Sequence, residues 1–381
     1  QTWGGAYHWL NFFIGKGLLT SEGEVWRRQR RRIQPLFKAG RMGTYVAGVV
    51  SLADELGGRL EARADSGTAV DIVPEIVRFT LNVVTSTLLG MPLQEDIVPL
   101  RESLLTCIAW VSRQTRAYPL YGLLHRGDRL PSTRRNRRFL QALAVVESVV
   151  ERTIQLHREE RGDPESLITA LLETRETGDP VPIRDEVVTM LLAGTETTAM
   201  ALCWSLSLLS QHPDVRTRLE RESDEVLGRG LPDHSDLARL TFTRMVGLEA
   251  LRLYPPVYTL SFKAVETKVL AGVTVPAGSR VVLGLYGLHR NSRHWTAPHQ
   301  FDPDRFDAER SAGRHRFAYL PFSAGPRHCV GQHFALMEMQ VVLAVLLGRL
   351  RLELAPGQPE GMALGFTLRP RRGLKMILHR R

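Results

Sequence analysis

Apolar residues recur every three or four positions over several long stretches, which is the spacing of helices that bury one face. Residues 71–89, 139–156 and 332–350 follow this pattern, and breaks rich in Gly, Pro and charge fall near 127–131, 162–164 and 178–182. The last third differs, because short β-like runs at 273–276 and 281–285 are punctuated by Gly and Pro. The pattern predicts a mainly α-helical protein with small β-sheets.

Residues 187–210 form the most apolar stretch, with Glu196 as its single charge. Its length alone would allow a membrane span. The polar centre, Gly194-Thr-Glu-Thr-Thr198, and the lack of aromatic belts favour instead a helix buried all round in a folded protein. A glycine, several threonines and a carboxylate are each unfavourable inside a buried helix. Such a concentration of unfavourable residues is expected at a functional site. The structural alternative is a kinked helix whose polar groups satisfy one another.

A second group of signals surrounds Cys329, in the run Phe322-Ser-Ala-Gly-Pro-Arg-His-Cys-Val-Gly331. The Gly and Pro residues indicate a shaped loop, and the helical pattern that follows places Cys329 just before a helix N-terminus. Such a position favours a thiolate, so Cys329 is a candidate nucleophile, redox thiol or metal ligand. Zinc is a weak alternative, because His315, His328 and His333 lie nearby without a standard zinc spacing.

Glu249 and Arg252 are three residues apart, so they share one helix face and can form an ion pair. Pro255 and Pro256 end that predicted helix, and Arg305 offers the same glutamate a second cation.

Taken together and in this order, these residues resemble the cytochrome P450 family over essentially the whole chain. The cysteine-loop motif matches at Phe322, Gly325, Arg327, Cys329 and Gly331, and the central-helix motif at Ala193, Gly194, Glu196, Thr197 and Thr198. The Glu249–Arg252 pair, the Pro303-Asp-Arg305-Phe306 element and the Trp26–Arg30 element complete the set.

The resemblance implies a haem-thiolate monooxygenase that binds haem b (iron protoporphyrin IX) and hydroxylates with O2. Cys329 would be the axial iron ligand, with Phe322, Gly325 and Gly331 shaping its loop. Arg327, Trp26 and Arg30 would bind the propionates, and Ala193 and Gly194 would line the oxygen side of the haem. Glu196 and Thr197 would deliver protons, and Glu249, Arg252 and Arg305 would form a structural network. A non-catalytic haem-thiolate sensor is the alternative, although it would not need Glu196 and Thr197.

The sequence departs from the family at one haem contact and at its beginning. Where many members place a propionate-binding arginine, ten residues before Gly272, this chain has Phe262, and the adjacent Lys263 is the candidate substitute. The spacing between Trp26 and Cys329 resembles that of the family members that hydroxylate fatty acids and carotenoids. Relative to that type the first helices and strands have no counterpart, so we expect an N-terminally incomplete domain.

By position, the resemblance places five residues at the substrate pocket. All but the threonine are apolar, which predicts a lipophilic substrate, either a fatty acid or an isoprenoid. These residues are Leu19, Leu192, Val257, Thr259 and Phe366.

Composition and charge add expectations about partners and location. The chain has 381 residues with a formal net charge of +10, and no Gly/Ser-rich linker divides it, so we expect one domain over residues 1–381. The basic balance suits an acidic electron carrier, a ferredoxin or flavodoxin with its NAD(P)H reductase. No basic stripe is interleaved with stacking aromatics, which argues against nucleic-acid binding. The three scattered cysteines favour a reducing, cytoplasmic location. Because 187–210 is expected to be a buried helix, we expect no membrane span in this chain, while an anchor upstream of residue 1 stays open.

Overall fold

The computed structural model describes the backbone of residues 2–3, 6–91, 97–124, 130, 132–159, 161–175, 179–358 and 361–381, and the side chains of these except 2–8 and 115–124. Within this part the chain groups into two compact units. The first comprises residues 1–35, 89–193 and 259–284, and the second comprises 36–88, 194–258 and 285–381. Most of the predicted break at 127–131 and residue 178 of the third break lie outside the described residues.

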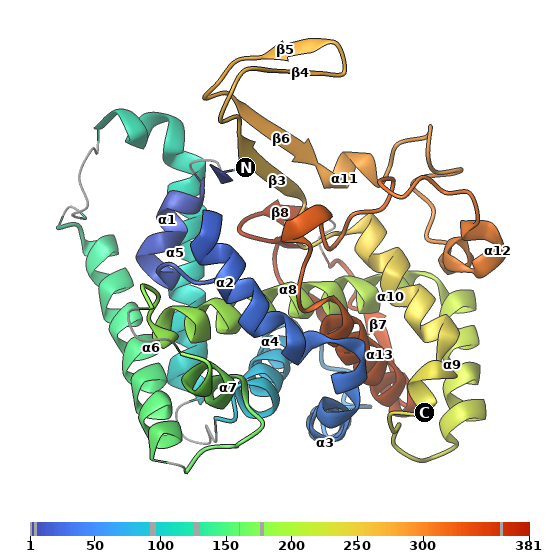
Figure 1. The fold of residues 1–381 in the computed structure, drawn as a ribbon. Helices are drawn as coiled ribbons and strands as arrows, with labels where there is room; N and C mark the ends of the chain where they lie inside the picture. The colour runs from blue at the N-terminus through green and yellow to red at the C-terminus, as the bar shows by residue number, and fades with distance from the viewer. Residues whose placement is uncertain are drawn as a thin grey trace. The chain divides into compact units, whose positions relative to one another are not determined.

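The first unit is built on helices. They are α1 (Ala6–Ile14), α2 (Gly23–Ile33), α5 (Ile97–Leu124), α6 (Arg134–Arg158), α7 (Leu167–Glu173) and the first part of α8 (Ile183–Gln211). Helices α5 and α6 lie side by side (Figure 1), joined by stacked Trp110 and Phe139 with ring centroids 4.0 Å apart. Thr133 caps α6 by accepting the amide of Asn136, whose side chain in turn accepts the indole N–H of Trp110 at 2.8 Å.

Two small sheets complete the first unit. One has the order β1 (Thr2–Trp3), β3 (Thr259–Lys263), β6 (Arg280–Gly284), and the other is the hairpin of β4 (Lys268–Leu270) and β5 (Val273–Val275). All pairs are antiparallel. The predicted runs at 273–276 and 281–285 therefore form strands, each within one residue of the expected bounds.

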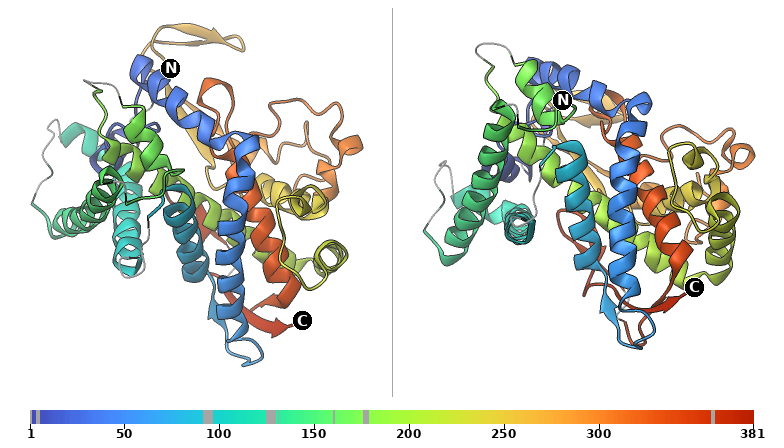
Figure 2. Two further views of the ribbon diagram at one scale, coloured as in Figure 1. Left: turned by 60° about the horizontal axis from the view of Figure 1, so that its bottom comes forward. Right: turned by 90° about the horizontal axis from the view of Figure 1, so that it is seen from below.

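The second unit has a helical core around α13 (Gln332–Arg349), which is buried almost continuously from Phe334 to Leu347. It packs on α3 (Met42–Glu61), which runs beside it in both views of Figure 2, and on α9 (Pro213–Leu227) and α10 (Thr241–Leu253). Because α13 has neighbours on several sides, it lacks the polar face of a surface helix. Short helical elements are η1 (Gln34–Phe37), η2 (Ala39–Arg41), η4 (Asp236–Ala238), α11 (Leu285–Leu288), η5 (Pro303–Phe306), α12 (Ala308–Ser311) and η6 (Gly325–Arg327).

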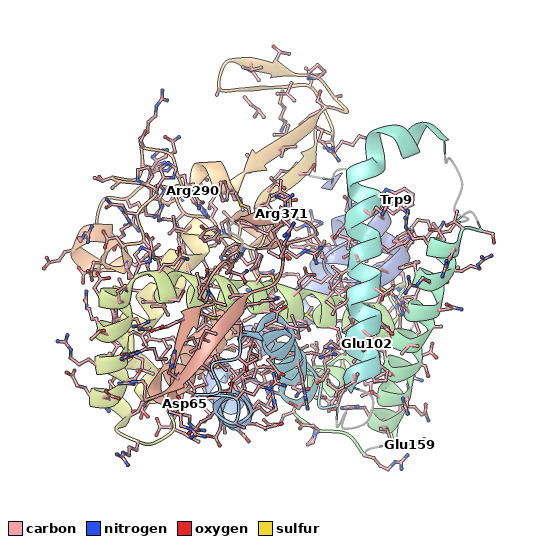
Figure 3. All side chains as sticks on the ribbon, turned by 180° about the vertical axis from the view of Figure 1, so that it is seen from behind. Trp9, Asp65, Glu102, Glu159, Arg290 and Arg371 are labelled. Atoms are coloured by element: carbon pink, nitrogen blue, oxygen red, sulfur yellow. The ribbon has the colours of Figure 1, made fainter. Side chains whose placement is uncertain are left out.

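The predicted helix at 71–89 is divided in the structure. Residues 70–71 form β2 (Val70–Asp71), α4 spans Val73–Asn82, and η3 (Val83–Leu88) continues as a π-helix. The sheet β2-β10-β7 joins this strand to β7 (Leu350–Leu354) and β10 (Lys375–Arg380), and β8 (Met362–Leu364) pairs with β9 (Leu368–Pro370). Figure 3 shows β7 and β10 side by side near Asp65, whose amide donates to the carbonyl of Leu378 at 2.9 Å.

Helix α8 contains the whole apolar stretch predicted at 187–210 and contributes residues to both units. Among the described residues it is the helix long and apolar enough to cross a bilayer, yet 83% of its most apolar window is buried inside the protein. Its apolar character is therefore that of a core helix.

Candidate functional site

The loop that carries Cys329 is held by backbone hydrogen bonds and by left-handed residues. Ser323 and Gly325 have φ of 62° and 72°, a conformation that glycine adopts without strain. The amide of Cys329 donates to the carbonyl of Phe322 at 2.9 Å, which closes the loop. Helix α13 begins three residues after Cys329, so the thiol stands at the helix N-terminus as predicted.

Cys329 is the one exposed thiol of the three in the chain. Burial raises the pKa of Cys107 to about 12 and raises the pKa of Cys203 as well, so neither of these ionises near neutral pH. Ligand chemistry that needs a thiolate therefore falls to Cys329.

A Cβ built at Gly331 would lie 4.0 Å from both the Cys329 sulfur and Phe37, which is ordinary contact within the protein. The left-handed backbone of the loop falls at Ser323 and Gly325, and not at Gly331. The predicted role of Gly331 toward the haem stays a prediction.

The polar centre of α8 opens one face of an otherwise buried helix. Ala193 is exposed, and Gly194 and Thr197 are half-buried, while Leu192 is 1% exposed and Glu196 4%. Residues 193 and 194 lie four and three positions before Thr197, so both neighbour it on the helix surface. Three of the five motif residues are therefore accessible, whereas Glu196 and Thr198 are buried.

Gly194 also allows close helix packing. A Cβ at this position would lie 2.6 Å from Cγ2 of Val84 in the π-helix η3, closer than real Cβ contacts come. The glycine is therefore required by the approach of η3, in addition to any space it leaves on the open face.

Glu196 points away from that open face and is buried against another segment. The Thr367 hydroxyl donates to its Oε1 at 2.6 Å, and Oε2 has no hydrogen-bond partner among the described residues. Burial raises the pKa of Glu196, while the Thr367 hydrogen bond and the charge of Arg369 lower it. Sequence analysis did not find Thr367, because the two residues are 171 positions apart.

Glu249, Arg252 and Arg305 come together in the second unit. Arg252 and Glu249 form a bidentate pair with N–O distances of 2.6 and 2.7 Å, and both side chains are fully buried. The Arg305 Nε lies 3.3 Å from Glu249 Oε1, and the amide of Asp302 donates to the same oxygen at 2.9 Å. The charges are therefore paired and hydrogen-bonded, as burial requires.

This network continues toward the cysteine loop through His289. The Arg252 guanidinium donates to the His289 carbonyl at 2.8 Å, and the amide of Leu320 donates to the ring Nε2 at 2.9 Å. Burial lowers the pKa of His289 to about 4, so the ring stays neutral and can accept that amide. This contact anchors the chain two residues before Phe322. No local pattern predicted it, because the sequence marked histidines only as weak zinc-ligand candidates.

The first unit carries Trp26, Arg30 and Lys263. Trp26 and Arg30 are one turn apart on α2 and half-buried, and the Arg30 Nε donates to Gln34 Oε1 at 3.1 Å. Lys263 is exposed on β3, directly opposite Arg280 on β6. Side chains alternate along a strand, so Lys263 faces away from the side that Phe262 faces. Lys263 therefore cannot stand in for an arginine at 262 without a change of register, and Arg280 is a second cation that the sequence alone did not locate.

The five predicted pocket residues belong to two sets, one in each unit. Leu19 is half-buried beside the start of α8, where the amide of Leu18 donates to Glu186 at 2.9 Å, and Leu192 is buried on α8 itself. In the second unit the Tyr258 hydroxyl donates to the Gly365 carbonyl at 2.9 Å, which brings half-buried Val257 and Phe366 to adjoining segments. Thr259 is exposed at the start of β3.

No three His, Cys, Asp or Glu side chains gather as a metal-binding cluster within the described part of the chain. The chemistry of the second unit instead suits a haem. It presents one accessible thiol at a helix N-terminus and, on α8, a half-buried glycine and a half-buried threonine. A single thiolate donor with a small-residue face is what an axially ligated haem with an oxygen side needs.

Comparison with known proteins gives the same answer. The chain is 35% identical over 361 residues to cyclooctat-9-en-7-ol 5-monooxygenase of Streptomyces melanosporofaciens, covering 93% of this chain and 76% of that protein. It is 30% identical over 390 residues to carotene epsilon-monooxygenase, chloroplastic, of Arabidopsis thaliana, covering 97% of this chain and 72% of that protein. The crystal structure of the cytochrome P450DA haem domain matches with a TM-score of 0.88 and 25% identity, covering 99% of this chain and 83% of that one. Because the cytochrome P450 family model also matches residues 4–377, the chain belongs to the cytochrome P450 family and is a haem-thiolate monooxygenase.

Proposed function

We propose that this monooxygenase hydroxylates an isoprenoid, a terpene or carotenoid, rather than a fatty acid. The observation that carries the proposal is the 35% identity to a protein named for a monooxygenation of cyclooctat-9-en-7-ol, supported by the similarity to a carotene monooxygenase. The five pocket residues fit, because none of them supplies a cation. A fatty-acid carboxylate is best held by an arginine, whereas a largely hydrocarbon substrate needs only apolar contact.

In this proposal the haem supplies the activation of O2 when it is bound, and the chain supplies ligation, orientation and protons. Cys329 would supply the thiolate that holds the iron, and amides of its loop would tune the sulfur through hydrogen bonds. Arg327, Trp26 and Arg30 would hold the propionates. Ala193 and Gly194 would border the oxygen side.

Proton supply is assigned to Thr197 and Glu196. Thr197 is half-buried on the open face of α8, so its hydroxyl would be available to pass a proton toward the oxygen side of the site. Glu196 is buried one residue earlier, and burial raises the pKa of its carboxyl, which favours the protonated form. A threonine at the surface of the site and an acid behind it form the order that proton transfer from outside requires.

The electron donor is proposed to be a separate acidic protein, a ferredoxin or flavodoxin. The region around Cys329 supports this assignment, because half-buried Arg327 and exposed His333 flank the thiol and exposed Lys38 follows Phe37, which lies near Gly331. An acidic carrier that docks on these groups approaches the sulfur directly.

A panel of substrates tests the proposed class. Purified holoenzyme is titrated with a cyclic diterpene, β-carotene and palmitate, and the Soret difference spectrum reports displacement of the water ligand. We expect saturable spectral shifts with an isoprenoid and a product with one added oxygen atom. A shift and product with palmitate alone would overturn the isoprenoid assignment.

A further inference from the structure

Glu196 makes a single hydrogen bond among the described residues, and its partner comes from the far end of the chain. The Thr367 hydroxyl donates to Oε1 at 2.6 Å, while Oε2 is buried without a partner in the same described set. Thr367 itself is 0% exposed. The two carboxyl oxygens of Glu196 are therefore chemically distinct.

The segment that carries Thr367 is fixed to the elements around α8 by its backbone. The amide of Leu368 donates to the Pro256 carbonyl at 2.9 Å, and the Trp204 indole donates to the Leu368 carbonyl at 3.0 Å. Trp204 lies eight residues after Glu196, two turns along the same face of α8. The hydroxyl of Thr367 is thus held at a fixed place relative to Glu196.

Two flanking contacts strengthen this hold. The Trp204 ring stacks on Tyr254 with centroids 4.0 Å apart and planes within 7°. The Tyr258 hydroxyl donates to the Gly365 carbonyl at 2.9 Å, two residues before Thr367.

A donated hydrogen bond decides where the acidic proton of a carboxyl resides. Because Thr367 donates, Oε1 acts as the acceptor and the carboxylic proton belongs on Oε2. The arrangement therefore leaves Oε2, the unpartnered oxygen, as the proton-carrying atom.

We propose that Thr367 is a positioning residue for proton delivery, which fixes the Glu196 carboxyl so that Oε2 carries and releases the proton. The inference rests on the proposed role of Glu196 as the acid of this monooxygenase. Protons leave Oε2 for the reacting oxygen and are replaced from water, so the carboxyl returns to its starting state after each turnover. Thr367 touches no reacting atom and acts only through Glu196.

Charge around Glu196 gives the proposal a pH signature. Arg369, two residues after Thr367, lowers the pKa of Glu196, as does the Thr367 hydrogen bond, against the larger effect of burial. Removing the hydroxyl leaves burial and Arg369 alone. The pKa of Glu196 is then expected to rise further, so the pH dependence of coupled turnover moves to higher pH.

The test compares Thr367→Val, which keeps the shape, with Thr367→Ser, which keeps the hydroxyl. In holoenzyme with reductase and substrate, the product formed per NAD(P)H is expected to fall about fivefold to tenfold in Thr367→Val, the factor that one hydrogen bond of ordinary strength corresponds to. Thr367→Ser should retain most of the product formed per NAD(P)H in the unmodified protein. Thr80→Val is the matched control, because Thr80 is equally buried on α4 and donates only to the Val77 carbonyl.

Infrared spectroscopy detects the hydrogen bond between Thr367 and Glu196 without turnover. The C=O band of the protonated Glu196 carboxyl, identified by its loss in Glu196→Gln, should shift to higher wavenumber in Thr367→Val, because its carbonyl loses a donor. It should stay in place in Thr367→Ser and Thr80→Val. Thr367→Ala repeats the comparison if the valine variant does not retain haem.

The outcomes separate the two hypotheses. Normal coupling in Glu196→Gln would remove Glu196 from the mechanism and with it the proposed acid, whatever Thr367 does. Impaired Glu196→Gln together with unchanged coupling and an unmoved band in Thr367→Val would overturn the role of Thr367 alone. Equal loss in Thr367→Ser and Thr367→Val would overturn it too, since shape rather than the hydroxyl would then matter.

Discussion

At the residue scale, the chain assigns different chemistry to side chains of the same type by burial. Two thiols are deep in helices with a raised pKa, and the third is exposed in a loop before α13. The sequence pattern around Cys329 was sufficient to select it. That Cys107 and Cys203 stay protonated follows only from their burial in the folded structure, which raises the pKa of both thiols.

Substitution of Cys329 tests this division directly. The reduced protein with carbon monoxide should show the red-shifted Soret band of thiolate ligation. Cys329→Ala is expected to abolish this band, because the other thiols are buried and protonated. Cys107→Ala and Cys203→Ala serve as controls and should retain it. A thiolate-type band that survives in Cys329→Ala would refute the assignment.

A second residue-scale prediction concerns Glu186 at the start of α8. Burial raises its pKa to about 8 from 4.5, against the amide of Leu18 and the charge of Arg32, which lower it, while Asp185 and Asp179 raise it further. The folded protein then holds a proton that the unfolded chain releases above pH 4.5. The free energy of unfolding should therefore fall as the pH rises from 4.5 to about 8, by at most about 1.4 kcal/mol per pH unit.

Glu186→Gln removes the titrating group and keeps an acceptor for the Leu18 amide. Urea unfolding at several pH values should show a shallower pH dependence in this variant than in the unmodified protein. Glu309→Gln, at an exposed position of α12, should follow the unmodified protein. The same slope in Glu186→Gln and the unmodified protein would contradict the raised pKa.

At the element scale, the π-helix η3 and the glycine of α8 depend on each other. Apolar periodicity over 71–89 predicted a helix, but periodicity does not distinguish an α-helix from a π-helix of the same length. The tight contact of Val84 with Gly194 explains why the chain tolerates glycine inside α8, where it costs about 1 kcal/mol relative to alanine.

Gly194→Ala tests this packing. The new methyl group would overlap Val84, so we expect a loss of about 1–3 kcal/mol in the free energy of unfolding. Combining it with Val84→Ala should recover part of the loss, and a double-mutant cycle measures the coupling. Gly348→Ala on α13, where a Cβ meets no atom within 4 Å, should instead stabilise by up to about 1 kcal/mol. Additive effects of Gly194→Ala and Val84→Ala would rule out the contact.

At the scale of the whole molecule, the net charge of +10 becomes a prediction about kinetics. Reduction by an acidic ferredoxin should slow about tenfold as the salt concentration rises from about 0.05 to about 0.5 M, because long-range attraction is screened. Stopped-flow reduction of the ferric holoenzyme measures this rate.

A matched pair of charge reversals locates the effect. Lys38→Glu should slow the reduction, since Lys38 is exposed and adjoins Phe37, near the cysteine loop. Arg351→Glu should not, because exposed Arg351 follows the far end of α13, a helix about 27 Å long that starts beside Cys329. Equal effects of the two variants would show that overall charge, rather than a docking surface, controls the rate.

The sequence by itself determined the family, the candidate ligand Cys329, the buried central helix and the partners Glu249 and Arg252, because motifs and periodicity are local and survive in one dimension. Only the tertiary structure decided which distant groups meet: Thr367 with Glu196, His289 with Leu320, Val84 with Gly194, and Lys263 with Arg280 on the face opposite Phe262. The physical reason is that burial, hydrogen-bond satisfaction and strand register depend on segments tens to hundreds of residues apart. No local pattern records which of them the fold brings together.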